Sequence, residues 1–166
     1  MTRITLGGIP TTTIGKIPKN GTKAPAFELT TSDLSKKSLS DYIGFTIILN
    51  VFPSIETRTC AASVRTFNKL AASIENTKVL CISKDLPFAQ NRFCAAEGIE
   101  DVITLSDFAD GNFGKNYGLE ITSGSFTNLL SRSVIVIDPK GFVTYSEQIF
   151  EIGNEPNYDN ALAAIK

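Results

Sequence analysis

The chain has 166 residues, about one domain's worth, and its hydrophobic (42%) and charged (20%) fractions are typical of a globular protein rather than a disordered one. Sixteen Lys and Arg against seventeen Asp and Glu give a net charge of −1 with no long run of like charges, which argues against a nucleic-acid or anionic-membrane partner. The absence of histidine excludes Ser-His-Asp triads, Cys-His nucleophile pairs and imidazole metal sites.

The three cysteines, Cys60, Cys81 and Cys94, are far apart in the sequence and form no Cys-x-x-Cys motif. Thiolate zinc sites, thioredoxin-type dithiol sites and secreted disulfide frameworks are therefore not expected. Residues 1–6 lack the apolar stretch of a signal peptide, and the most apolar run, residues 45–52, is too short to span a bilayer. These features predict a soluble protein of the cytoplasm.

The first predicted element in chain order is a β-hairpin. Residues 3–6 and 11–17 are rich in β-branched side chains and are joined by the glycine- and proline-containing residues 7–10. Residues 27–30 form a short predicted strand. Polar connections without regular structure are expected over residues 31–41.

The middle of the chain alternates between strands and helices. Residues 45–52 are apolar on both faces, as expected for a central strand covered on both sides. Over residues 59–74, apolar side chains recur at spacings of three and four, which predicts a helix. Strands are then expected at residues 78–83 and 102–105. Between them, residues 87–97 open with a proline and are followed by a glycine, which is typical of a helix.

The last third predicts a short helix at residues 112–117, a hairpin of strands at 133–137 and 142–145, and a C-terminal helix at 156–166. This order of elements predicts an α/β fold with a central mixed β-sheet flanked by helices on both faces. There is no internal repeat and no long linker, so we expect one domain over residues 1–166, decorated by an N-terminal hairpin within residues 1–18.

One segment, directly after the central strand, carries the candidate chemistry. It places Cys60 where a buried strand ends and a helix begins, so free N–H groups and the positive end of the helix dipole favour the thiolate form. Thr57 can bring a hydroxyl close to the sulfur, and Pro53, which lacks an N–H, can wall off one side of the pocket. The alternative is an inert buried thiol, the usual state of a free cysteine. The complete Pro-x-x-x-Thr-x-x-Cys spacing favours the reactive interpretation.

That spacing, from Pro53 through Thr57 to Cys60, resembles the active-site motif of the peroxiredoxins. Further segments resemble the bacterial thiol peroxidases, an atypical 2-Cys branch of that family, at residues 52–55, 63–68, 85–90, 92–94, 105–108 and 155–158. The similarity covers essentially the whole chain, with the motifs in the family's order. It implies a thioredoxin-like fold and reduction of hydroperoxides by thiol chemistry, without a metal, haem or other cofactor.

The resemblance also implies a role for each site residue. Cys60 would be the peroxidatic cysteine, which attacks the peroxide O–O bond and becomes a sulfenic acid. Cys94 would be the resolving cysteine, which closes an intrachain Cys60–Cys94 disulfide that thioredoxin reduces. Arg132 would hold the thiolate and the polarised peroxide oxygens, Thr57 would hydrogen-bond the thiolate or the peroxide, and Pro53 would shield the intermediate. Hydrogen peroxide and alkyl hydroperoxides are the implied substrates, antioxidant defence the implied purpose, and a homodimer the implied assembly.

Some of these residues also have a simpler interpretation without a catalytic role. The alternative for Arg132 is a solvated or surface-paired side chain, and the alternative for Cys94 is a helix cysteine packed in the core. Cys81 is predicted to be a small apolar residue of a strand. For the whole protein, the alternatives to an enzyme are a peroxide sensor or relay that passes its disulfide to a client, and a non-catalytic binding module. Steady turnover of peroxide by a catalytic amount of protein separates the enzyme from both.

Overall fold

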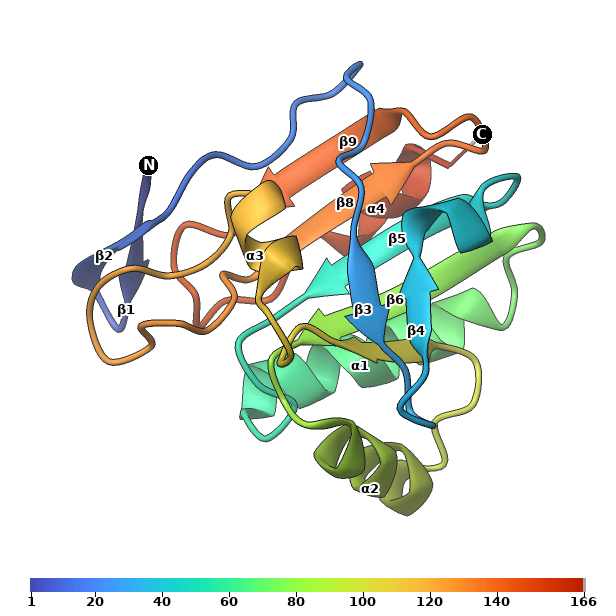
Figure 1. The fold of residues 1–166 in the computed structure, drawn as a ribbon, viewed down its shortest axis with the longest axis horizontal. Helices are drawn as coiled ribbons and strands as arrows, with labels where there is room; N and C mark the ends of the chain where they lie inside the picture. The colour runs from blue at the N-terminus through green and yellow to red at the C-terminus, as the bar shows by residue number, and fades with distance from the viewer. Residues whose placement is uncertain (166) are drawn as a thin grey trace.

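The computed structural model describes residues 1–165, and its centre is a seven-stranded mixed β-sheet with the strand order β4-β3-β7-β6-β5-β8-β9 (Figure 1). The strands are β1 (Thr2–Leu6), β2 (Ile9–Thr13), β3 (Glu28–Thr30), β4 (Lys36–Ser38), β5 (Thr46–Val51), β6 (Thr77–Ser83), β7 (Ile103–Ser106), β8 (Ser133–Ile137) and β9 (Val143–Gln148). The helices are η1 (Leu39–Tyr42, a 3₁₀ helix), α1 (Arg58–Ala71), α2 (Pro87–Glu97), α3 (Asn112–Asn116) and α4 (Tyr158–Ala163). Strands β5, β6 and β7 run parallel, and the remaining pairings are antiparallel.

The central strand β5 is buried on both faces because its alternating side chains enter two different cores. Ile47, Leu49 and Val51 point into the first core, and Ile48 points into the second. This is the arrangement that a continuous apolar run predicts for a strand covered on both sides.

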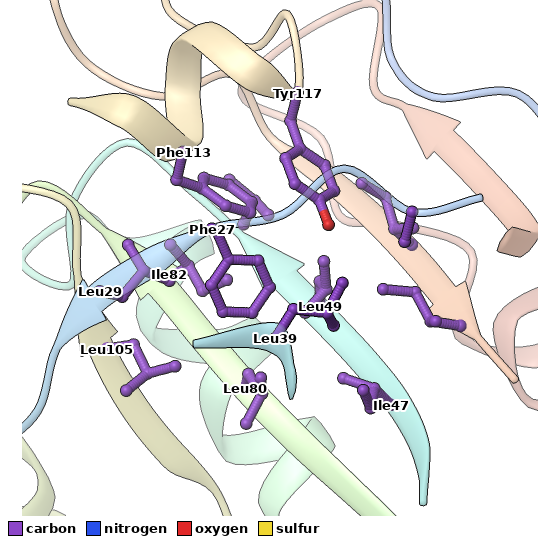
Figure 2. Packing of buried hydrophobic residues seen from close by; sticks show 14 of the residues in the cluster. Phe27, Leu29, Leu39, Ile47, Leu49, Leu80, Ile82, Leu105, Phe113 and Tyr117 are labelled. Carbon is purple, nitrogen blue, oxygen red and sulfur yellow. The ribbon is translucent and has the colours of Figure 1, made fainter. Parts of the chain in front are cut away.

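The first core lies beneath the β3–β4 hairpin and α3 (Figure 2). Phe27 and Leu29, from the start of that hairpin, pack against the strand residues Leu49 and Leu80. The β3–β4 hairpin joins the rest of the sheet through one residue pair, Thr30 and Ser106 of β7, so it can fold over this face instead of extending the sheet.

The second core lies beneath α1 and α4, which Figure 1 shows behind the sheet. Val64 and Phe67 of α1 enter it at a spacing of three residues, and the ring of Phe67 meets that of Tyr158 edge-on at 5.1 Å. Helix α2 is attached differently, since its buried residues are only Pro87 and Gln90.

The N-terminal hairpin β1–β2 forms a separate two-stranded sheet beside this body. Its two-residue turn, Gly7–Gly8, has positive φ angles of 59° and 80°, which is the combination that a type I′ turn needs and that glycine adopts at little cost. The strand β1 reaches back to residues 150–152 near the C-terminus through two backbone hydrogen bonds.

The predicted fold class and the alternation of strands and helices are confirmed, and α2 has the predicted bounds. The expectation that residues 31–41 lack regular structure is wrong: this segment contains β4 and the first three residues of η1. The second hairpin strand is Ile9–Thr13 rather than 11–17, and the C-terminal helix is shorter than 156–166. Lys166, the last residue of that predicted helix, lies outside the described residues.

Candidate functional site

Cys60 lies in the first turn of α1, at the carboxyl end of the parallel strands. Its side chain is fully buried, and its sulfur belongs to the second core beside Ile55 and Val64. The loop from Phe52 to Thr57 connects β5 to the helix, so Cys60 is displayed where open α/β sheets bind ligands.

Thr57 is the N-cap of α1. Its hydroxyl oxygen accepts a hydrogen bond from the backbone N–H of Cys60 at 3.3 Å, and the same hydroxyl donates to the carbonyl of Ser54 at 3.3 Å. The cap satisfies one of the free N–H groups of the helix start. Thr57 therefore contacts the backbone of Cys60 and not its sulfur, and of the two implied partners, the thiolate or the peroxide, the peroxide is left as the expected one.

Arg132, which directly precedes β8, supplies the contact to the sulfur. Its Nη2 donates to Sγ of Cys60 at 3.2 Å, and its Nε donates to the carbonyl oxygen of Ile152 at 2.7 Å. The side chain is 2% exposed, and the third nitrogen, Nη1, has no hydrogen-bond partner within residues 1–165. The interpretation of Arg132 as a solvated surface residue is therefore wrong.

The charge of Arg132 is also unpaired by carboxylates: no ion pair within residues 1–165 includes it. Removing a guanidinium from water is costly unless an anion and hydrogen bonds compensate for the lost hydration. The Cys60 sulfur, as a thiolate, is the group in direct contact that can supply the negative charge. Nη1 leaves two N–H groups for a further ligand beside the sulfur.

Asp85, just beyond the end of β6, organises the loop that carries Pro53 and Thr57. Its carboxylate accepts hydrogen bonds from the hydroxyl of Ser54 at 2.7 Å, the backbone N–H of Ile55 at 2.7 Å and the hydroxyl of Ser83 at 2.6 Å. Pro53 itself is buried. In the sequence, Asp85 stands out only as the first residue of the segment 85–90 that resembles the thiol peroxidases. Its position after β6, next to the end of β5, was the available signal for this contact.

Cys94 lies on α2, is half-buried, and is a free thiol, as are Cys60 and Cys81. Burial raises the pKa of the Cys94 thiol above its usual value. The structure thus brings Thr57 and Arg132 to Cys60 directly and leaves Cys94 unbonded on a separate helix.

Two ion pairs tie α2 to its surroundings on either side of Cys94. Arg92 contacts Glu56 of the Cys60 loop at 2.7 Å, and Glu97 accepts two hydrogen bonds of 2.9 Å from Arg65 of α1. These side chains are well exposed, and exposed pairs stabilise by only about 0–1 kcal/mol each. These two pairs therefore add little to the attachment of α2, which also has buried hydrogen bonds from Gln90 to Ser83 and Leu105 and a partly buried Phe93 against the second core.

Cys81 faces the second core from β6 and is fully buried. Burial raises the pKa of its thiol to about 12, although a 3.7 Å hydrogen bond from the amide of Asn50 partly opposes this. The same amide donates to Ser63, whose hydroxyl bonds the carbonyl of Cys60. Cys81 is thus a protonated core thiol, as predicted.

No helix within residues 1–165 is both long enough and apolar enough to cross a membrane. The same residues contain no cluster of three or more His, Cys, Asp or Glu side chains that could bind a metal ion.

Comparison with known proteins places this site in context. Residues 19–162 match the family model Redoxin. The chain is 50% identical over 165 residues to thiol peroxidases of Mycobacterium tuberculosis and Mycobacterium bovis, covering 99% of this chain and 99% of theirs. A peroxiredoxin-like protein from Aquifex aeolicus superposes with a TM-score of 0.92 at 35% identity, covering 98% of this chain and 95% of that one. A thiol peroxidase from Chromobacterium violaceum shares the fold, with a TM-score of 0.90 at 21% identity over 97% of this chain and 93% of that one.

Proposed function

We propose, on the premise that this chain belongs to the Redoxin family and is a thiol-dependent peroxidase, that Cys60 is the residue that reduces the hydroperoxide. One observation carries this assignment. Within residues 1–165, Arg132 is buried without a carboxylate partner, bonds the Cys60 sulfur through Nη2, and has no hydrogen-bond partner for Nη1. Neither Cys81 nor Cys94 has a cation in hydrogen-bonding contact among the described residues.

In the first step, the Cys60 thiolate attacks the terminal oxygen of R–O–O–H. An S–O bond forms and the O–O bond breaks, so the sulfur is oxidised to a sulfenic acid and the peroxide is reduced to an alkoxide or hydroxide, which takes a proton from water. Negative charge moves from the sulfur onto the leaving oxygen. Arg132, with Nη2 on the sulfur and Nη1 without a partner in residues 1–165, can stabilise both ends of that movement.

In the second step, the Cys94 thiolate attacks the Cys60 sulfenic acid and displaces hydroxide, which leaves as water after it takes a proton. The product is an intrachain Cys60–Cys94 disulfide. A dithiol of the thioredoxin type then reduces this disulfide by thiol–disulfide exchange and becomes a disulfide itself. The sparse burial of α2 and the exposure of its ion pairs support this step, because a helix with few buried residues can rearrange to bring Cys94 to Cys60.

Thr57 and Pro53 do not react with the peroxide; they hold Cys60 in position and form part of its surroundings. Thr57 caps the helix and holds the backbone of Cys60, and its hydroxyl can donate to a bound peroxide only by releasing the Ser54 carbonyl. Pro53 offers a buried wall without an N–H. We assign hydrogen peroxide and alkyl hydroperoxides as substrates, thioredoxin as reductant and antioxidant defence as the purpose. We also propose a cytoplasmic homodimer of one-domain subunits, residues 1–166, each with its own Cys60–Cys94 pair.

The test is peroxide-dependent oxidation of NADPH with thioredoxin, thioredoxin reductase and a catalytic amount of the protein. Sustained turnover is expected for the wild type and none for Cys60→Ser, which is nearly isosteric but has no accessible anion at neutral pH. Consumption of a single equivalent of peroxide, followed by a persistent mixed disulfide with one client, would show a relay instead. Substantial turnover by Cys60→Ser would remove Cys60 from its role.

A further inference from the structure

We propose that Glu151 is a positioning residue for Arg132: its carboxylate docks the turn of the N-terminal hairpin against residues 150–153, and so fixes the carbonyl group that orients the guanidinium. The inference rests on the role of Arg132 proposed above. It gives the N-terminal hairpin a part in the reaction, although no residue of the hairpin contacts Cys60 through a hydrogen bond within residues 1–165.

The Glu151 carboxylate accepts four hydrogen bonds. Oε1 accepts from the backbone N–H groups of Gly7 at 2.9 Å and Gly153 at 3.1 Å. Oε2 accepts from the N–H of Gly8 at 3.0 Å and from the hydroxyl of Thr5 at 2.8 Å. The N–H of Gly8 is the largest of several causes that lower the pKa of this carboxyl to about 2. Glu151 is therefore ionised throughout the neutral range.

The hairpin turn is built to present these donors. Gly7 and Gly8 both have positive φ, and successive N–H groups in such a turn converge on one side and form an anion-binding concavity. Neither glycine has an atom near the position of a Cβ, so the glycines are needed for backbone conformation and not for lack of space. The anion that fills the concavity is Glu151.

The opposite side of residues 150–153 faces the reactive site. The carbonyl oxygen of Ile152 accepts from Nε of Arg132 at 2.7 Å, and the carbonyl oxygen of Gly153 accepts from the hydroxyl of Thr59 in α1 at 3.0 Å. The hairpin strand β1 adds two backbone bonds, from Thr5 N–H to the Phe150 carbonyl and from Ile152 N–H to the Thr5 carbonyl. One short segment thus joins the hairpin to the guanidinium.

The orientation of the guanidinium depends on that segment. The group is planar, so fixing Nε on the Ile152 carbonyl and Nη2 on the Cys60 sulfur also fixes the direction of the free Nη1. Glu151 is the residue immediately before Ile152. Losing its four bonds frees the turn and lets the Ile152 carbonyl shift, and a misplacement of about 1 Å can cost on the order of a hundredfold in rate.

Glu151→Gln is the sharpest variant, because it keeps the size of the side chain but replaces one oxygen with an NH₂ that faces two donors. The matched control is Thr12→Val on β2, which removes hydroxyl contacts to Thr122 and Ser123 in the segment between α3 and β8 and leaves the Glu151 contacts intact. Both are made in full-length Cys94→Ser protein, where oxidation of Cys60 is observed without disulfide formation.

The measurements are the second-order rate of Cys60 oxidation by hydrogen peroxide and the pH midpoint of Cys60 labelling by iodoacetamide. For Glu151→Gln we expect a rate at least roughly tenfold lower and a midpoint displaced to higher pH, because the cation is less well aimed at the sulfur. Thr12→Val should match the parent in both. A purely structural role for Glu151 would lower the thermal stability of Glu151→Gln and change neither reading.

A double-mutant cycle with Arg132→Lys identifies the route of the effect. In the Arg132→Lys background, Glu151→Gln should produce little further slowing. An equal slowing in both backgrounds would overturn the inference, and so would a parental rate for Glu151→Gln alone. A parental rate for Arg132→Lys would refute the proposed role of Arg132 along with it. If Glu151→Gln does not fold, Thr5→Val removes only one of the four donors. It should slow oxidation by a smaller factor, and a parental rate would again overturn the inference.

Discussion

At the scale of single residues, the site is defined by a buried cation that directly contacts the Cys60 sulfur and no carboxylate within residues 1–165. Arg132 is buried and hydrogen-bonded to Cys60 and to the Ile152 carbonyl, and none of the ion pairs in residues 1–165 includes it. Burial of a guanidinium without a carboxylate is unfavourable for folding, so the Cys60 sulfur and the Ile152 carbonyl are the groups in contact that can compensate for its lost hydration.

Arg132→Lys should therefore slow Cys60 oxidation although it keeps the charge. A flexible ammonium is a point charge and cannot present three donors in one plane to the carbonyl, the sulfur and a peroxide. Losing one aimed donor commonly costs about 3 kcal/mol of transition-state stabilisation, or roughly a hundredfold in rate. Stopped-flow oxidation measures this, with Arg92→Lys on the surface of α2 as the control. A rate within about twofold of the wild type would show that Arg132 is peripheral.

Cys81→Ala should retain most peroxidase activity and lose stability. The thiol is fully buried in the second core and its pKa is raised to about 12, so it is inert at neutral pH. Removing the sulfur leaves a small cavity and costs roughly 1–2 kcal/mol of unfolding free energy. Urea denaturation and the NADPH assay measure the two effects. Loss of activity in a protein that still folds would contradict the structural role of Cys81.

The sequence alone could predict some of these residues and not others. Cys60, Thr57 and Pro53 lie within one motif at a strand–helix junction, so local pattern was sufficient to select them. Arg132 is 72 residues from Cys60 in the sequence, and only the family resemblance pointed to it. The bond from Thr57 to the Cys60 backbone, instead of its sulfur, depends on a hydroxyl orientation that no pattern encodes.

At the scale of elements, local signals were reliable where the chain marks its own boundaries. Helix α2 was predicted with correct bounds because a proline opens it and Gly98, with φ of 66°, ends it. Strand β4 was missed because Lys36, Lys37 and Ser38 are polar and face solvent, so they show no alternation. They form a strand through pairing with β3, which is a tertiary effect.

Helix α2 should lose its structure when the disulfide forms. Only Pro87 and Gln90 of the helix are buried, and its ion pairs through Arg92 and Glu97 are exposed. Hydrogen exchange should show lost protection over residues 88–98 in the disulfide form compared with the reduced form, together with a smaller loss around Cys60. The core strand β6 serves as the internal control. Unchanged protection of α2 in the disulfide form would rule out this opening.

Disulfide formation should accelerate with rising pH. Burial raises the pKa of Cys94, so the thiol is protonated at neutral pH while α2 is folded, and only the thiolate attacks the sulfenic acid. Exposure on opening of α2 returns the pKa toward its ordinary value of about 8.5. The slower phase of a stopped-flow trace should therefore speed up between pH 6 and 8. A slower phase that does not change over this range would mean that deprotonation of Cys94 does not limit resolution.

At the scale of the whole molecule, the two faces of the sheet carry different cores, and only the second core contains Cys60. One face carries the core beneath β3, β4 and α3 and stabilises the fold (Figure 2). The other face, with α1 and α4, carries Cys60, and the carboxyl ends of β5 and β6 hold its loop through Asp85. The N-terminal hairpin lies beside this sheet (Figure 1) and is hydrogen-bonded to residues 150–152 through the backbone of Thr5.

The central claim is that a hydroperoxide oxidises Cys60 and that Cys94 of the same chain resolves the product. The most direct test is mass spectrometry of reduced wild-type protein after one equivalent of hydrogen peroxide, digested without a reducing agent. We expect a chain lighter by two hydrogen atoms, a peptide pair joined through Cys60 and Cys94, and Cys81 recovered as a free thiol. A cross-link that contains Cys81, a disulfide between two subunits, or Cys60 recovered unmodified would contradict it.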